Sequence, residues 1–250
     1  MDAWIWQVPV LVVAGAAAGF LNVLAGGGSL LTLPLLIFLG LPAAVANGTN
    51  RVAIFFQNIF AIAGFRRQGV FPARLALLCT LPALAGSYLG ASLAVDIDEE
   101  LFRRLLALIM IGVLLFTLLD PARRWRVEVE RFSRLRLTIL LASFFLIGVY
   151  GGFVQAGVGF LVISGLLAHG LDLVRINAVK VIVIFGFTVV ALGVFVAHGQ
   201  VDYGLGTALA AGNSAGGWIA SHVAVKKGHR WIRGVVSLTV LVFALKLFFG

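Results

Sequence analysis

Negative charge is scarce in this chain. Only 12% of its 250 residues are charged and ten are acidic, whereas 61% are hydrophobic. This is more apolar surface than one soluble core of this size can bury, so the composition predicts a membrane protein. The long stretches without acidic residues can supply transmembrane helices, because a bilayer core takes about 20 apolar residues per helix. All ten acidic residues fall in or beside short polar breaks: Asp2, Asp96, Asp98, Glu99, Glu100, Asp120, Glu128, Glu130, Asp172 and Asp202.

The residues that most enzymes and metal sites need are also missing. Cys79 is the single cysteine, so no intrachain disulfide can form, and its place in an apolar run predicts a packed thiol. The four histidines share no short spacing, which disfavours a metal site. The sequence contains no Walker-type GxxxxGK[ST] motif and no arrangement typical of nucleophilic catalysis. We therefore expect no enzymatic activity, no cofactor and no bound metal.

Positive charge is present, and its distribution indicates membrane orientation. The formal net charge is +9, but the Lys and Arg residues gather in loops between apolar segments, so we expect no nucleic-acid partner. The first 20 residues have no basic region ahead of their apolar run, which predicts an uncleaved first span. Trp4 and Trp6 would then lie at a membrane interface.

Apolar segments of two kinds follow one another along the chain. Six have the length of single spans: 45–64, 72–94, 101–119, 176–197, 203–224 and 231–249. Segments 7–40 and 137–168 are longer and are interrupted by glycines, namely Gly26, Gly27, Gly28, Gly148, Gly151, Gly152, Gly157 and Gly159. Glycine permits non-helical backbone, so each long segment is predicted to break into two pieces inside the membrane, as a re-entrant pair or a double crossing.

The two halves of the chain resemble each other at an offset of about 130 residues. The matched positions are Gly26–Leu30 with Gly157–Leu161, Asn47 with Asn177, Gly69 with Gly199, and Gly86 with Gly216. This register predicts an internal duplication. The expected organisation is a first transmembrane repeat over 1–119, a basic cytoplasmic linker over 120–136 and a second transmembrane repeat over 137–250.

Loop charges predict how the two repeats are oriented. If every segment crossed once, the two sides would carry nine and seven loop Lys or Arg residues, which specifies no orientation. If each glycine-broken segment enters and leaves on one side, the split becomes fourteen to two, in agreement with the positive-inside rule. We therefore predict an all-α polytopic membrane protein with both termini outside. Its two inverted repeats would each consist of a glycine-broken segment followed by three transmembrane helices.

The two glycine-rich breaks are the first candidate site. A short helix that starts after each break would point its positive end into the gap, where an anion could bind. The alternative is that these glycines only allow close helix packing. The candidate residues are Gly26, Gly27, Gly28 and Ser29 in the first break and Gln155, Gly157 and Gly159 in the second.

A second group of polar residues follows each break. The first half has Asn47, Thr49, Asn50 and Arg51, and the second half has Asn177 and Lys180. Amide N–H groups, an Arg fork and a Lys point charge are suitable donors for an oxyanion. In the alternative interpretation, Arg51 and Lys180 extend to the interface, and Gln155 makes only interhelical hydrogen bonds.

The order of these motifs resembles a known family. A glycine-rich break followed by LLTLPLLIFLGLP, then ANGTN, then a loop ending in QGV, with a weaker second copy, is similar to the sulfite exporter TauE/SafE family. The resemblance covers residues 10–249. It implies a multi-pass protein of the bacterial inner (plasma) membrane that exports sulfite, sulfonates or related sulfur-containing organic anions. The second copy departs from the first, with QAGVG for AGGGS and Lys180 in the place of Asn50.

We therefore expect a transporter whose partners are a small anionic substrate and the lipid bilayer. The sequence leaves a homo-oligomer open. Two alternatives also stay open: a passive anion channel of the same inverted-repeat architecture, and a membrane subunit of a larger transport complex. The spans lack carboxylates for a proton relay, which favours electrogenic, uncoupled export.

Overall fold

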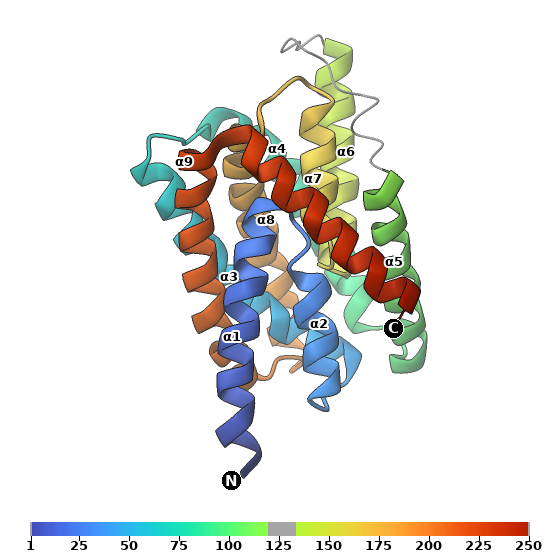
Figure 1. The fold of residues 1–250 in the computed structure, drawn as a ribbon. Helices are drawn as coiled ribbons and strands as arrows, with labels where there is room; N and C mark the ends of the chain where they lie inside the picture. Colours follow the sequence, from blue (N-terminus) through green and yellow to red (C-terminus); the bar gives the residue numbers. More distant parts are fainter. Residues whose placement is uncertain (1, 120–133, 250) are drawn as a thin grey trace.

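The computed structural model describes residues 2–119 and 134–249, and these two stretches are helical without any strand. The prediction of an all-helical protein is confirmed. The elements, in the order shown in Figure 1, are α1 (Asp2–Leu24), α2 (Ser29–Phe38), α3 (Ala43–Arg67), α4 (Ala73–Val95), α5 (Glu99–Leu119), α6 (Arg134–Phe153), α7 (Val158–Leu167), α8 (Leu173–Ala197) and α9 (Tyr203–Phe249).

Four of these helices, α1, α4, α6 and α8, are long and apolar enough to cross a membrane by length and composition. A helix satisfies its own backbone hydrogen bonds, which lipid cannot do. Large apolar side chains point outward from the same helices, as Leu77, Leu81 and Leu93 do on α4. Such faces suit a lipid surrounding, and the chain is a multi-pass membrane protein.

Both long segments break where glycines were expected to interrupt them. The ten-residue helices α2 and α7 follow α1 and α6, and Figure 1 shows the chain reversing at each break. Ten residues extend only about 15 Å, half the thickness of a bilayer core. Gly148, Gly151 and Gly152 lie inside α6, so the second break comes later than those three glycines suggested.

Two predicted boundaries differ from the structure. Segments 203–224 and 231–249 were expected to be separate spans, but they form the single helix α9. The prediction was wrong because the polar residues between them contain no proline, and a lone glycine costs only about 1 kcal/mol in a helix. Figure 1 shows α9 changing direction between an upright limb and a sloping limb. The second difference is that α6 begins at Arg134, within the predicted 120–136 linker, whose residues 120–133 lie outside the described part.

The helices of the two halves are interlocked. Helix α1 packs on α9, and α6 packs on α4, so each half supplies a helix to the other half's bundle. Glycines make these approaches close: a Cβ on Gly19 would overlap the backbone of Asn213, and one on Gly148 would overlap that of Ala83. Small residues serve helix packing in membranes in this way. The packing alternative therefore applies to Gly148 and to Gly152, whose Cβ would overlap Ser87.

Helices α3 and α8 pack against each other between the two bundles. Their rings Phe55 and Phe185 lie 5.3 Å apart, centroid to centroid. These two residues occupy matching positions 130 residues apart in the sequence. The turns at Gly40 and Gly69, with φ of 98° and 76°, likewise match those at Gly170 and Gly199, with φ of 85° and 68°. The second half thus repeats the helix and turn order of the first as far as the turn before α9, but the single helix α9 occupies the place of both α4 and α5.

Candidate functional site

The two chain breaks lie in direct contact. A Cβ on Gly26 would overlap the backbone of Gly159, and one on Gly159 would overlap that of Gly26. Gly26 has a φ of 92°, in the left-handed region that favours glycine. The residues predicted to form the site in the two halves therefore meet, although 133 positions separate them in the sequence.

Each break leads into the amino-terminal end of a short helix. Gly28 precedes α2 and Gly157 precedes α7, and neither position supplies a side-chain cap. The positive ends of two helix dipoles thus adjoin the contact between the breaks. Gly157 has a φ of 70°, whereas in the first break it is Gly26, and not Gly27, that adopts a positive φ. Gly28 packs tightly, because its Cβ would overlap the carbonyl oxygen of Ala18.

Two basic side chains hold the carboxyl-terminal ends of the broken helices. Arg51 of α3 donates from Nη1 to Gly151 O at 2.9 Å and from Nη2 to Gly152 O at 2.6 Å, at the end of α6. Lys180 of α8 donates from Nζ to Asn22 O at 3.0 Å and to Val23 O at 2.7 Å, at the end of α1. Such carbonyls lack an N–H partner within their helix and carry partial negative charge, which a cation offsets.

Neither basic side chain reaches the surface. Arg51 is 0% exposed and Lys180 is 1% exposed, so the interpretation that they extend to the interface is wrong. The sequence placed both within two turns of a loop, which made that interpretation reasonable. The structure instead gives each of them a backbone partner in the opposite half of the chain, a partner that sequence spacing does not reveal.

Two asparagines likewise donate to the end of a helix in the opposite half of the chain. Asn47 Nδ2 donates to Phe153 O at 2.8 Å, and Asn177 Nδ2 donates to Leu24 O at 3.3 Å. Phe153 and Leu24 are the last residues of α6 and α1. An Asn and a basic residue from each half therefore cap the broken helix of the other half.

The remaining predicted residues divide between the breaks and a neighbouring turn. Asn50 Oδ1 accepts from Thr32 Oγ1 at 2.7 Å, which joins α3 to α2, and Gln155 Nε2 donates to Thr188 Oγ1 at 2.6 Å. Ser29 is buried at the start of α2. Thr49 does not join this group, because its hydroxyl accepts from Asp202 N at 2.8 Å, in the turn before α9.

Sequence reasoning missed three polar partners of these residues: Asn22, Thr32 and Thr188. Asn22 Nδ2 donates to Gln57 Oε1 at 3.2 Å, and all three residues are buried in otherwise apolar helices. The position of Asn22 within one turn of the Gly26–Gly28 run was a usable signal. The other two follow only from knowing which helices pack together.

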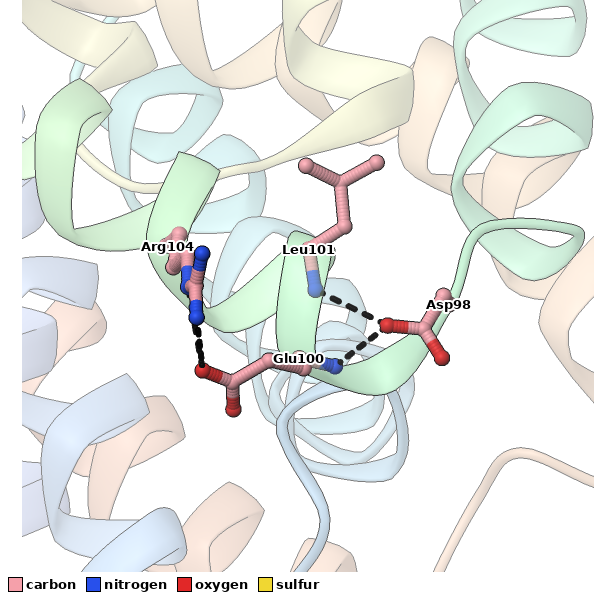
Figure 2. Close-up of polar contacts among 4 residues, drawn as sticks. All are labelled: Asp98, Glu100, Leu101 and Arg104. Atoms are coloured by element: carbon pink, nitrogen blue, oxygen red, sulfur yellow. Dashed lines mark hydrogen bonds and ion pairs between the residues drawn. The ribbon is translucent and has the colours of Figure 1, made fainter.

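Among the described residues, no acidic side chain is buried beside these two cations. Four acidic residues form an acidic cluster at the start of α5: Asp96, Asp98, Glu99 and Glu100. Figure 2 shows part of it: Asp98 Oδ1 accepts from the N–H groups of Glu100 and Leu101. Glu100 also pairs with Arg104 at 3.0 Å, and both are exposed, so this ion pair contributes little to stability. The acidic cluster at this helix start thus begins α5 and does not neutralise the cations at the breaks.

Discontinuous helices that meet inside a helical membrane protein, with buried charge at the meeting point, are the architecture of secondary membrane transporters. Comparison of the chain with known proteins agrees with this class. The family model described as Sulfite exporter TauE/SafE matches residues 11–247, and the chain belongs to this family. The resemblance found in the sequence is thereby confirmed.

Three relatives illustrate how far the similarity extends. The probable membrane transporter protein ORF9 of Sinorhizobium sp is 29% identical, over 95% of this chain and 90% of its own length. A probable membrane transporter protein of Haemophilus influenzae is 27% identical, over 99% and 96%. The probable membrane transporter protein YfcA of Escherichia coli is 26% identical, over 96% and 89%. No solved structure gives a significant match.

Proposed function

We propose that this protein exports a small anion, namely sulfite, a sulfonate or a related sulfur-containing organic anion, and that the anion binds where the two chain breaks meet. The observation that carries this proposal is the charge at that point. Two cations and two helix amino termini adjoin the breaks, and the described residues supply no buried carboxylate to oppose them. A buried, positively charged region favours an anion over a neutral or cationic substrate.

We propose further that the two halves are inverted repeats. The exchanged capping of α6 by Arg51 and of α1 by Lys180 supports this, as does the contact of Phe55 with Phe185. A pseudo-two-fold axis in the membrane plane would relate Arg51 to Lys180, α6 to α1 and Phe55 to Phe185. Alternating access would follow from motion of one bundle against the other. The direct contact of Gly26 with Gly159 would then represent a state in which the path is closed at the breaks.

The proposed location is the bacterial inner membrane, with both termini outside and the 120–136 linker in the cytoplasm. Arg67 Cζ lies 5.0 Å from the centroid of the Trp218 ring, and Gln68 donates to Ser221 O, so the basic end of α3 and the basic middle of α9 share one side. Gln200 donates to Val95 O on the opposite side, next to the acidic start of α5. Basic residues mark the cytoplasmic side by the positive-inside rule.

Transport by the purified chain in liposomes tests the proposal. Vesicles loaded with sulfite, sulfate, thiosulfate, a sulfonate or a carboxylate should release one of the sulfur oxyanions faster than protein-free vesicles do. Substrate on the far side should accelerate exchange, since a carrier shows counterflow and a passive channel does not. Release of none of these anions would contradict the proposed function, and transport that needs an added ATPase would favour the subunit alternative.

A further inference from the structure

The first half of the chain contributes Asn47, Asn50 and Arg51 to the breaks, and the second half contributes Asn177 and Lys180. These two clusters look alike but differ in how many of their polar atoms have a partner. In the second-half cluster, every polar side-chain atom has a protein partner. Lys180 Nζ donates to Asn22 O, Val23 O and Asn177 Oδ1, at 3.0, 2.7 and 2.8 Å. An ammonium group has three N–H donors, so none is left for a ligand. Asn177 uses its Nδ2 on Leu24 O and its Oδ1 on Lys180, so neither of its polar atoms lacks a partner.

In the first-half cluster, each residue keeps one buried polar atom without a partner. These atoms are Arg51 Nε, Asn47 Oδ1 and Asn50 Nδ2. All three residues are 0% exposed. Asn50 and Arg51 come three and four residues after Asn47, so both lie one turn from Asn47, and the three residues fall within an arc of about 100° on α3.

A fourth unpartnered atom belongs to the other half of the chain. Gln155 Oε1 is buried without a partner, and Gln155 lies two residues beyond Phe153, whose carbonyl accepts from Asn47. Arg51, Asn47 and Gln155 are therefore joined through the end of α6, and Asn50 is the neighbour of Arg51 on α3. Native proteins rarely leave buried polar atoms unpaired, and several in one place point to a ligand or ordered water.

We propose that the transported anion is bound on one side of the pseudo-two-fold axis only, by Arg51 and Asn50 beside Gln155, and that Lys180 is a positioning residue that does not touch it. This inference rests on the proposed function and specifies which half of the site binds. Arg51 Nε and Asn50 Nδ2 are the free donors, and they suit two oxygens of one oxyanion.

The fixed orientation of the guanidinium supports this assignment. Arg51 is held by two carbonyls of α6, and its Cζ lies 4.7 Å from the centroid of the Phe195 ring. These contacts fix the plane of the fork and leave the Nε edge for the ligand. A planar fork binds oxyanions with defined geometry, whereas an ammonium group does not, so Lys cannot replace Arg51 without loss of binding.

The test compares Arg51→Lys with Lys180→Arg in liposomes, using sulfite as the probe and measuring KM and maximal rate separately. Both variants keep the charge. We expect Arg51→Lys to raise KM about tenfold or more, since it loses a charged hydrogen bond. Lys180→Arg should change KM less than about twofold, because any effect it has on the α1 end falls on the maximal rate.

A second pair keeps the test decisive if Arg51→Lys does not fold. Asn50→Leu removes an unpartnered donor and should raise KM, whereas Asn177→Leu should reduce the amount of folded protein without raising KM. Sulfite should raise the melting temperature of the wild-type and Lys180→Arg proteins in detergent, but not that of Arg51→Lys or Asn50→Leu.

Equal increases in KM for Arg51→Lys and Lys180→Arg would overturn one-sided binding. Stabilisation of Asn50→Leu by sulfite to the wild-type extent would overturn it too. A wild-type protein that no anion of the panel stabilises, and that transports none, would instead overturn the proposed function itself, and one-sided binding with it.

Discussion

At the scale of single residues, the chain breaks depend on pairs of groups that complete each other's hydrogen bonds. Val23 and Gly152, near the ends of α1 and α6, are buried, and Lys180 and Arg51 donate to their carbonyls as water does at an exposed helix end. A buried cation is costly unless it is hydrogen-bonded, and a buried carbonyl is costly unless it accepts. Each group therefore removes the cost of the other, which explains why two basic residues are retained at this depth.

The contact of Gly26 with Gly159 gives the first prediction. Gly26→Ala should destabilise the protein by about 2 kcal/mol or more, because the methyl group strains a positive φ and overlaps backbone on α7. Gly193→Ala is the matched control, since a Cβ there meets nothing within 4 Å and the residue lies inside α8. It should be neutral or stabilising by up to about 1 kcal/mol. Melting in detergent measures both, and equal melting temperatures would show that the breaks yield easily.

The residues of the candidate site could be singled out from the sequence, but their hydrogen-bond partners could not. Glycine runs and the polar residues Asn47, Arg51, Asn177 and Lys180 stand out in an apolar sequence. Nothing local reveals that Arg51 binds carbonyls at the end of α6, because that pairing spans 100 residues or more. For the same reason Thr49 was grouped with the site, although its hydroxyl bonds the turn before α9.

At the scale of helices, one cap joins α5 to α3. Glu99 Oε1 accepts from Ala43 N at 2.6 Å and its Oε2 accepts from Ala44 N at 3.4 Å. The carboxylate satisfies amide groups at the start of α3, the helix that carries Arg51, and complements its dipole. In the second half, Asp172 caps its own helix, α8, through Val174 N and Arg175 N.

This cap gives a second prediction. Glu99→Ala should cost about 1 to 2 kcal/mol of stability, because two amide groups at the start of α3 lose their acceptor. Glu100→Ala is the matched control: its ion pair with Arg104 is exposed and should contribute less than about 1 kcal/mol. Thermal melts of both variants decide the matter. A larger loss for Glu100→Ala would mean that the start of α3 does not need this carboxylate.

The sequence predicted which segments are helical, but not which helices pack together. Apolar length and glycine interruption predicted both broken segments and most boundaries within a few residues. The interlocked packing of α1 on α9 and of α6 on α4 was not predicted, because small residues that permit close approach do not specify the partner. The continuity of α9 was missed for a local reason, since its polar middle resembles a loop in composition.

At the scale of the whole molecule, the orientation in the membrane gives a third prediction. Cysteines placed singly at Arg67 and Lys227 in a Cys79→Ala background should be shielded from an impermeant thiol reagent in intact cells. A cysteine at Arg103 should be labelled, because that residue is exposed at the start of α5, on the opposite side. The labelling pattern of the three variants is the measurement. Labelling at Arg67 or Lys227 would rule out the inverted arrangement with both termini outside.

The absence of buried acids among the described residues leads to a fourth prediction, on the driving force. An interior negative by about 100 mV favours exit of each negative charge by roughly 2.3 kcal/mol, a gradient of about fiftyfold. We therefore expect sulfite efflux from liposomes to accelerate as the interior is made more negative with a potassium diffusion potential. Efflux that ignores the potential but follows a proton or sodium gradient would show that the anion's charge is compensated.

The packing of α1 on α9 also determines when the protein can finish folding. Helix α1 is synthesised before α9, yet the backbone that its Gly15 and Gly19 approach belongs to Leu209 and Asn213 of α9. Until then its glycine face has only lipid or the insertion machinery as a neighbour. A chain that stops before α9 therefore lacks the neighbour that the glycine face of α1 is shaped to meet.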